Sequence, residues 1–172
     1  MKQRILSILV DNNSGVLSRV SGLFSRRGYN IDSLTVGVTA DPRYSRMTVV
    51  AHGENQILEQ ITRQLSKLVE VRDIKVLESD RSVSRELMLI KVKANAKERE
   101  NVVSIVNLFR AKIVDVGLNS LIIEITGTNV KLAGFVDLLE GYEILEVART
   151  GLTGLSRGMD DVRYLDADGN II

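Results

Sequence analysis

Hydrophobic positions in the first half of the chain alternate between short β-branched runs and segments with helical spacing. Residues 4–10 and 71–77 are predicted to be strands, and residues 29–39 and 44–52 are predicted to form a hairpin around a turn at Pro42. Between these strands, apolar side chains recur at helical spacing. The two helical faces comprise Val16, Leu17, Val20, Leu23 and Phe24, and Ile57, Leu58, Ile61, Leu65 and Leu68. The order of elements is therefore βαββαβ.

The same order repeats after residue 84. Strands are predicted at residues 87–94, 113–116, 121–126 and 142–148, and the second and third of these form a hairpin. The two further helical faces comprise Val102, Ile105, Val106 and Phe109, and Leu132, Phe135, Val136 and Leu139. The fold class is therefore α+β, an α/β sandwich of two tandem ferredoxin-like modules, each with helices on one face of an antiparallel sheet.

Local composition divides the chain into four segments. Residues 1–78 form a first domain, and residues 79–84 read as a linker because they are polar apart from Val83. Residues 85–150 form a second domain. Residues 151–172 are rich in glycine and are predicted to be a loosely ordered tail.

Overall composition excludes several classes of protein. With 44% hydrophobic residues, 26% charged residues and a net charge of +1, the chain is neither a disordered protein nor one held to nucleic acid by its phosphates. The absence of cysteine excludes disulfides and thiolate catalysis, and it fits a reducing compartment. No apolar run approaches the roughly 20 residues of a membrane span or the core of a signal peptide. We expect a cytoplasmic protein with no membrane or nucleic-acid partner.

Residues suited to catalysis are few. The only histidine, His52, is expected at the end of a strand, where a structural or solvent-facing role is favoured over that of a general base. Asp160 and Asp161 form a carboxylate pair in the tail, where solvation is favoured over metal binding. The sequence contains no Walker loop, nucleophile elbow or histidine-metal motif.

The turn at residues 11–15 joins a strand to the start of a helix whose first N–H groups lack intrahelical partners. Such a helix end attracts a carboxylate, Gly15 permits close approach to the backbone, and Val16 follows with a free N–H. The Asn12 amide oxygen is placed to accept from an ammonium group, so the turn suits a zwitterion. The local alternative is an ordinary turn with Ser14 as the helix cap, and these five residues alone favour that alternative.

Asn30 follows Gly28, which is the predicted C-cap of the first helix. This residue begins the next strand, from which it could approach the same helix end of a neighbouring subunit. The basic residues Arg19, Arg26 and Arg27 are better explained as a solvated helix face than as a docking patch.

Four blocks of the sequence closely resemble one family. They are RILSILVDNNSGVLSRVSGLFSRRGYNIDSLTV at residues 4–36, SRMTV at 45–49, the run from QI to KLV at 60–69, and EVARTG to LSRG at 146–158. The family is the small, regulatory subunit of acetohydroxyacid (acetolactate) synthase. A match of this length favours ligand binding at the turn over the capping interpretation.

The resemblance implies an N-terminal ACT domain, a second ferredoxin-like domain and a homodimer whose ACT domains pair side by side. It implies that the chain has no catalytic residues, and that it binds and activates the catalytic large subunit and makes it inhibitable by valine, in branched-chain amino-acid biosynthesis. Carried over position by position, the effector-binding residues are Asn12, Gly15, Val16, Asn30 and Ile31, the last two from the neighbouring ACT domain. Thiamine diphosphate, magnesium and FAD are expected on the catalytic partner, and no cofactor or metal on this chain.

The corresponding turn of the second half, residues 94–97, has no glycine, so effector binding is expected only in the first half.

Three alternative functions for the whole chain remain. A free-standing amino-acid sensor would use the same fold and turn. An RNA-binding ferredoxin-like protein would need more aromatic residues than the 4% present, and an independent enzyme would need a nucleophile paired with a base.

Overall fold

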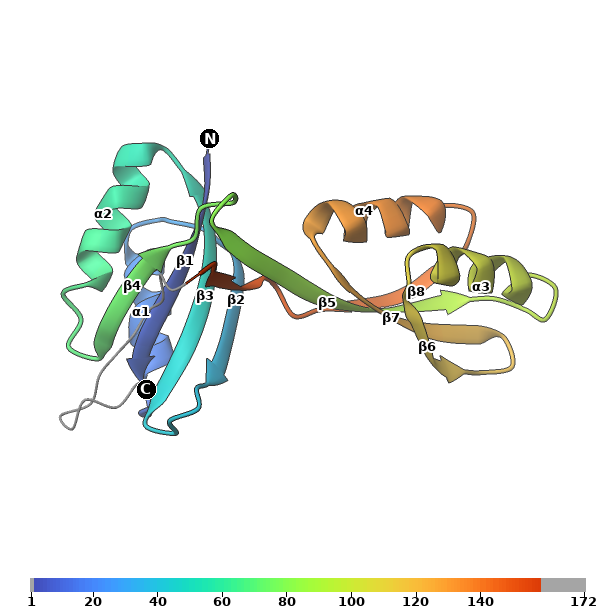
Figure 1. Cartoon of the computed structure of the whole chain (residues 1–172), viewed down its shortest axis with the longest axis horizontal. Helices are drawn as coiled ribbons and strands as arrows, with labels where there is room; N and C mark the ends of the chain where they lie inside the picture. Colours follow the sequence, from blue (N-terminus) through green and yellow to red (C-terminus); the bar gives the residue numbers. More distant parts are fainter. Residues whose placement is uncertain (1, 159–172) are drawn as a thin grey trace. The chain divides into compact units, whose positions relative to one another are not determined.

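The structure is a computed structural model that describes residues 2–158. The chain folds into two compact units, and each consists of an antiparallel sheet with two helices packed against it (Figure 1). The first unit comprises the residues up to Ser84 together with the segment that begins at Leu152, and the second is Arg85–Gly151. No helix within the described residues has the length and apolar character needed to cross a membrane.

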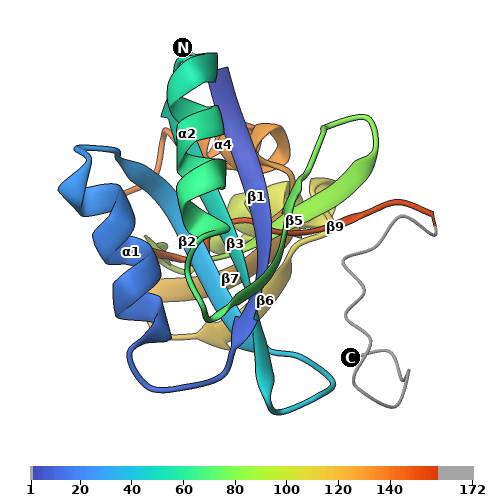
Figure 2. The ribbon, with the colours of Figure 1, turned by 90° about the vertical axis from the view of Figure 1, so that its left-hand side faces the viewer.

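The first unit has the predicted βαββαβ order. Its elements are β1 (Lys2–Asp11), α1 (Val16–Arg26), β2 (Ile31–Val38), β3 (Tyr44–Gly53), α2 (Asn55–Leu65) and β4 (Val71–Val76). The strand order is β2-β3-β1-β4, and every neighbouring pair is antiparallel. In Figure 2 both helices lie in front of this sheet, so one face of the sheet and one face of each helix enclose the core.

Most of the predicted helical face of α1 is buried. Val16, Val20 and Phe24 are at most 3% exposed and pack against core residues of the sheet. Leu17 was expected on the same face, but it is 45% exposed. The buried residues Val16, Val20 and Phe24 are four residues apart and form one stripe along the helix. Leu17 follows Val16 by one residue, or about 100° around the helix, and therefore lies outside this stripe.

Gly28 ends α1 as predicted. It adopts a φ of 68°, and its N–H donates to the Ser25 carbonyl at 3.1 Å. The next N–H, that of Tyr29, donates to the Phe24 carbonyl at 3.0 Å. These two bonds form a Schellman motif, in which a left-handed glycine lets the chain reverse into β2.

The second unit repeats the order. Its elements are β5 (Ser82–Lys93), whose first three residues belong to the first unit, α3 (Arg99–Leu108), β6 (Lys112–Val116), β7 (Ser120–Gly127), α4 (Asn129–Leu138) and β8 (Ile144–Arg149). The strand order is β6-β7-β5-β8. Ile90 and Ile123 face each other across β5 and β7, and they share one core cluster with Phe135; all three are fully buried. The Phe135 ring meets the Phe109 ring edge-on, with their centroids 5.3 Å apart.

Two segments differ from the sequence prediction. Residues 79–84 were expected to be a linker, but β5 begins at Ser82, so only a short turn separates it from β4. The expected tail contains a further strand, β9 (Thr153–Ser156), which pairs with β5. Gly154 permits this close packing, since a Cβ there would lie 2.9 Å from a Leu77 methyl group. Residues 159–172, including the Asp160 and Asp161 pair, lie outside the described part of the chain.

Candidate functional site

The β1–α1 loop is fixed at its start by contacts with distant parts of the first unit. The Asp11 carboxylate accepts two hydrogen bonds from Arg72 of β4, and the two side chains form an ion pair. The Asn12 amide nitrogen donates to the Pro42 carbonyl at 2.9 Å, and its amide oxygen accepts from the Ser45 hydroxyl at 3.0 Å. An amide oxygen has two lone pairs, so Asn12 keeps the capacity to accept a second hydrogen bond.

The N-terminal end of α1 carries no side-chain cap. Gly15 is the N-cap residue, with a left-handed φ of 86°, so the alternative interpretation in which Ser14 caps the helix does not hold. The first turn contains no acidic residue, and a Cβ on Gly15 would meet no atom within 4 Å. The Val16 N–H was expected to be free, but it makes a long contact of 3.4 Å with the Asn13 carbonyl. The positive end of the α1 dipole therefore has no side-chain cap, and the space beside the Gly15 Cα is open.

In the second unit, side chains bond the backbone of the turn at residues 95–98, which leads directly into α3. The Asn95 amide oxygen accepts from the N–H groups of Lys97 and Glu98 at 2.9 and 3.1 Å. The Glu98 carboxylate in turn accepts from the Asn95 N–H at 2.9 Å. This reciprocal arrangement in the turn just before α3 has the spacing and the bonds of a capping box, and the Asn95 amide oxygen occupies N–H groups that a ligand's carboxylate would otherwise take.

Asn30 and Ile31 lie at the other end of α1, just beyond the Schellman motif. Asn30 is exposed, and its amide donates to the Asp32 carboxylate at 3.1 Å. Ile31 is partly buried against the core at the start of β2. Because α1 has 11 residues, about 16 Å of helix separates this pair from Gly15. One chain therefore does not bring all five predicted residues together.

His52 lies at the end of β3, as the sequence analysis expected. Its Nδ1 atom pairs with the Asp32 carboxylate, and its side chain is 44% exposed. Within residues 2–158, no group of three or more histidine, cysteine, aspartate or glutamate side chains is arranged to hold a metal ion.

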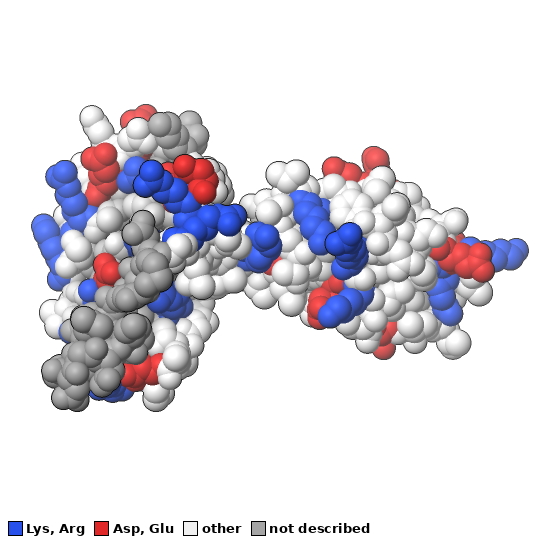
Figure 3. All heavy atoms as spheres, viewed as in Figure 1, with Lys and Arg blue, Asp and Glu red and all other residues white. Residues whose placement is uncertain are grey.

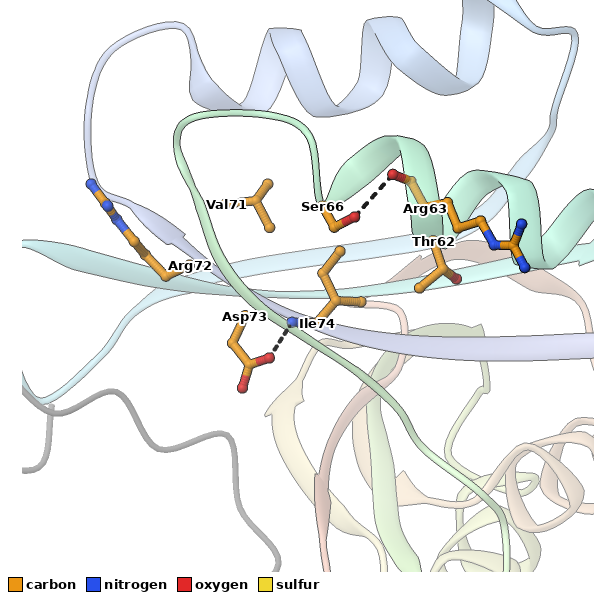
Figure 4. Close-up of a pocket in the computed structure, with 7 residues that line it drawn as sticks. All are labelled: Thr62, Arg63, Ser66, Val71, Arg72, Asp73 and Ile74. Atoms are coloured by element: carbon orange, nitrogen blue, oxygen red, sulfur yellow. Dashed lines mark hydrogen bonds between the residues drawn. The ribbon is translucent and has the colours of Figure 1, made fainter.

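A small hollow lies between the end of α2 and β4, and several of its polar groups are already engaged within the chain (Figure 4). The Ser66 hydroxyl donates to the Arg63 carbonyl, the Asp73 carboxylate accepts from the Ile74 N–H, and Thr62 donates to α2. Arg72 points away from the hollow in Figure 4 and pairs with Asp11. The hollow offers a small molecule little polar recognition.

Charged side chains of both signs are interspersed over each unit on the face drawn in Figure 3. In the second unit, the Glu86 carboxylate is 5% exposed and accepts two hydrogen bonds from Arg149, at 2.8 and 2.6 Å. These bonds raise the pKa of the Arg149 guanidinium above its ordinary value. The mixed charge pattern gives no support to a nucleic-acid interface.

Two contributors to the loop geometry were missed from the sequence. Pro42 and Ser45 hold Asn12 across 30 and 33 residues, and no local pattern predicts such a contact. The Glu98 cap did have a signal, because an asparagine followed three residues later by a glutamate is the spacing of a capping box.

Both halves of the chain match known protein families. The family described as the small subunit of acetolactate synthase matches residues 85–158. The family described as the AHAS small subunit-like ACT domain matches residues 6–73. The match to the small-subunit family includes β9, and the match to the ACT-domain family includes the β1–α1 loop and α1.

Individual relatives agree with this result. The acetolactate synthase small subunit of Mycolicibacterium smegmatis is 55% identical over 89% of this chain and 90% of its own length. The small subunit of acetolactate synthase isozyme 3 from Salmonella typhimurium is 48% identical over 91% of this chain and 96% of its own length. The crystal structure of the small subunit from Thermotoga maritima is 38% identical, covers 92% of this chain and 99% of that one, and superposes with a TM-score of 0.86.

Proposed function

The chain belongs to the family of acetolactate synthase small subunits, and on this premise we propose that it makes a catalytic large subunit responsive to valine. The proposed roles are activation of the catalytic subunit and feedback inhibition when valine binds at a seam between two ACT domains. Thiamine diphosphate, magnesium and FAD belong to the catalytic partner in this proposal.

The uncapped N-terminus of α1 is the observation that supports an effector site in the first unit. A capping side chain or a first-turn carboxylate would compete with a bound amino acid, and α1 has neither. The equivalent end of α3 is occupied by Asn95 and Glu98. The contrast between two helices in the same position of two similar units favours ligand binding at the first and self-capping at the second.

The chemistry of the loop suits the carboxylate and ammonium groups of valine. The carboxylate would accept hydrogen bonds from N–H groups in the first turn of α1, and Gly15 would leave the backbone accessible. The remaining lone pair on the Asn12 amide oxygen would accept from the ammonium group. Because Asn12 is bonded to Pro42 and Ser45, this acceptor is held in place before the ligand arrives.

A second copy of the chain would complete the site. Asn30 and Ile31 lie at the far end of α1, so in our proposal they reach the Gly15 loop from a neighbouring ACT domain. The Asn30 amide would provide a further polar contact, and Ile31 an apolar surface for the valine side chain. A ligand that contacts two chains stabilises the arrangement of the dimer in which both contacts form.

Valine would then act through its difference in affinity for two arrangements of the ACT pair. A coupling free energy of about 1–3 kcal/mol between effector site and catalytic subunit changes an equilibrium by roughly 5- to 150-fold. Charge-assisted hydrogen bonds of about 1.5–3 kcal/mol each are strong enough to supply this difference.

The direct experiment measures acetolactate formation by the cognate catalytic subunit, alone and with this protein, each with and without millimolar valine. We expect the protein to raise the activity and valine to reverse the increase. If the activity neither rises on addition of the protein nor becomes valine-sensitive, the proposed partnership is wrong.

A further inference from the structure

The Asn30 amide, which the proposed function brings to the effector, is held by other polar side chains of the first unit. We propose that Asp32 is a positioning residue of the effector site. It turns the Asn30 amide so that the amide oxygen accepts a hydrogen bond from the ammonium group of the bound amino acid. The inference deepens the proposed function and rests on it, because it assumes that Asn30 contacts valine.

An irregularity in the pairing of β2 with β3 takes Asp32 out of the regular strand pattern. The residue before Asp32 lies opposite Ala51, and the residue after it lies opposite Val50, so two steps along β2 correspond to one step along β3. Asp32 is therefore the extra residue of a β-bulge. A bulge changes the direction in which a side chain leaves the strand, and bulges are frequent next to functional sites.

Both carboxylate oxygens of Asp32 are engaged by side chains. Oδ1 accepts from the Asn30 side-chain amide at 3.1 Å, and Oδ2 pairs with Nδ1 of His52 near the end of β3. A rotation of the carboxylate would misalign both contacts, and hydrogen bonds weaken steeply when they are misaligned. His52 therefore holds Asp32 in the orientation in which it binds Asn30.

The chemistry of this contact decides which end of the Asn30 amide is left for a ligand. An ionised carboxylate only accepts hydrogen bonds, so the amide must turn its NH2 group towards Asp32. The amide oxygen then lies on the opposite side of the planar group, and no residue in the described part of the chain donates to it. An oxygen accepts from an ammonium group and repels a carboxylate. The contact with Asp32 therefore selects the ammonium end of a zwitterion.

This assignment is compatible with the contact proposed for Asn12. An ammonium group has three N–H donors, so it can bond the amide oxygens of Asn12 and Asn30 at the same time. Without Asp32, the Asn30 amide could turn over, and binding would have to order it. Ordering one such side chain weakens affinity by roughly 2- to 10-fold. A positioning role thus predicts a moderate loss of affinity that depends on the presence of Asn30.

The test is a double-mutant cycle on the complex of the full-length protein with the catalytic subunit. The four forms are the unaltered protein, Asp32→Ala, Asn30→Ala and the two substitutions combined. Equilibrium dialysis with labelled valine gives the Kd of each form, and thermal unfolding checks that each is folded. Asp32→Asn keeps the shape and an acceptor oxygen without the charge. The matched control is Glu59→Ala, which removes one negative charge from an exposed position on α2.

We expect Asp32→Ala to raise the Kd for valine by about 3- to 10-fold. The same substitution should change the Kd by less than about twofold when Asn30 is already alanine, because the two residues act as one unit. Asp32→Asn should bind valine within about twofold of the unaltered complex, since its oxygen can still accept from the Asn30 NH2 group. Glu59→Ala should leave the Kd unchanged.

Three results would overturn the inference and leave the proposed function standing. The first is normal valine binding by Asp32→Ala. The second is a loss that persists in full without Asn30, since Asp32 would then act on the ligand independently. The third is an equal loss in Asp32→Asn and Asp32→Ala, which would make charge responsible instead of orientation. If the unaltered complex binds no valine, the proposed function fails, and this inference fails with it.

Discussion

Substitution of Gly15 by aspartate gives the sharpest test of where valine binds. Gly15 adopts a φ of 86° at the uncapped end of α1, and an added Cβ would meet no atom within 4 Å. The added Cβ itself therefore meets no neighbouring atom, and the cost of the substitution lies in the backbone conformation. The left-handed backbone costs roughly 1 kcal/mol for an L-residue, and aspartate and asparagine tolerate it best after glycine. The added carboxylate also interacts favourably with the helix dipole, by about 0.3–1 kcal/mol.

The effect on valine should be much larger than the effect on folding. In the proposed pose, the Gly15→Asp carboxylate lies beside the carboxylate of the ligand. Two such charges about 4 Å apart repel by about 4 kcal/mol at an effective dielectric constant near 20. This energy corresponds to a loss of affinity of roughly a thousandfold. The variant should therefore activate the catalytic subunit normally and fail to respond to millimolar valine.

Gly15→Asn is the matched control, because asparagine has the same shape and backbone preference as aspartate without its charge. Valine inhibition curves for the two variants, each assembled with the catalytic subunit, separate charge from bulk. Asparagine should retain a weakened response. A normal valine response in Gly15→Asp would show that the effector binds elsewhere. Equal losses in both variants would instead show that side-chain volume at this position decides binding.

Three further predictions concern stability. Glu98→Ala should destabilise the second unit by about 1 kcal/mol through loss of the carboxylate bond to the Asn95 N–H, measured by urea unfolding, and leave valine inhibition unchanged. Phe135→Ala should cost about 3–5 kcal/mol in the same assay, because the side chain is fully buried. Hydrogen bonds from Arg43 lower the pKa of Asp41, so this pair stabilises the β2–β3 turn above the ordinary pKa and ceases to do so as the pH falls. Asp41→Asn should therefore reduce the pH dependence of unfolding below about pH 4, and an unchanged profile would contradict this reasoning.

The elements of the fold were predictable because the periodicity of buried residues is a local property of the sequence. The steps that place Val20 and Phe24 on one helical face are visible without tertiary information, and both residues are buried. The same reasoning failed for Leu17, which is exposed, because an apolar residue next to the buried stripe of a helix need not be buried itself. β9 was missed for a different reason, since four residues that include Gly154 are too few to show a strand pattern.

The candidate site was only partly predictable. The sequence identified the β1–α1 loop as a place for a zwitterion, but the residues of the turn alone favoured the alternative with Ser14 as the cap, whereas Gly15 occupies the N-cap position. The cap depends on backbone dihedral angles that the side chains alone do not determine. The attachment of Asn12 to Pro42 depends on the register of β1 against β3, which is a tertiary property.

The position of β9 has a consequence for the order in which the protein folds on the ribosome. The first unit includes Leu152 and β9, yet residues 85–151 of the second unit are synthesised before them. At about 5–20 residues per second, several seconds separate the emergence of β4 from that of β9. Until then the emerging first unit lacks the strand that packs against Leu77, and the hydroxyls of Ser33 and Thr35 lack the Leu152 backbone to which they bond. The unit that is synthesised first is therefore the last to be completed.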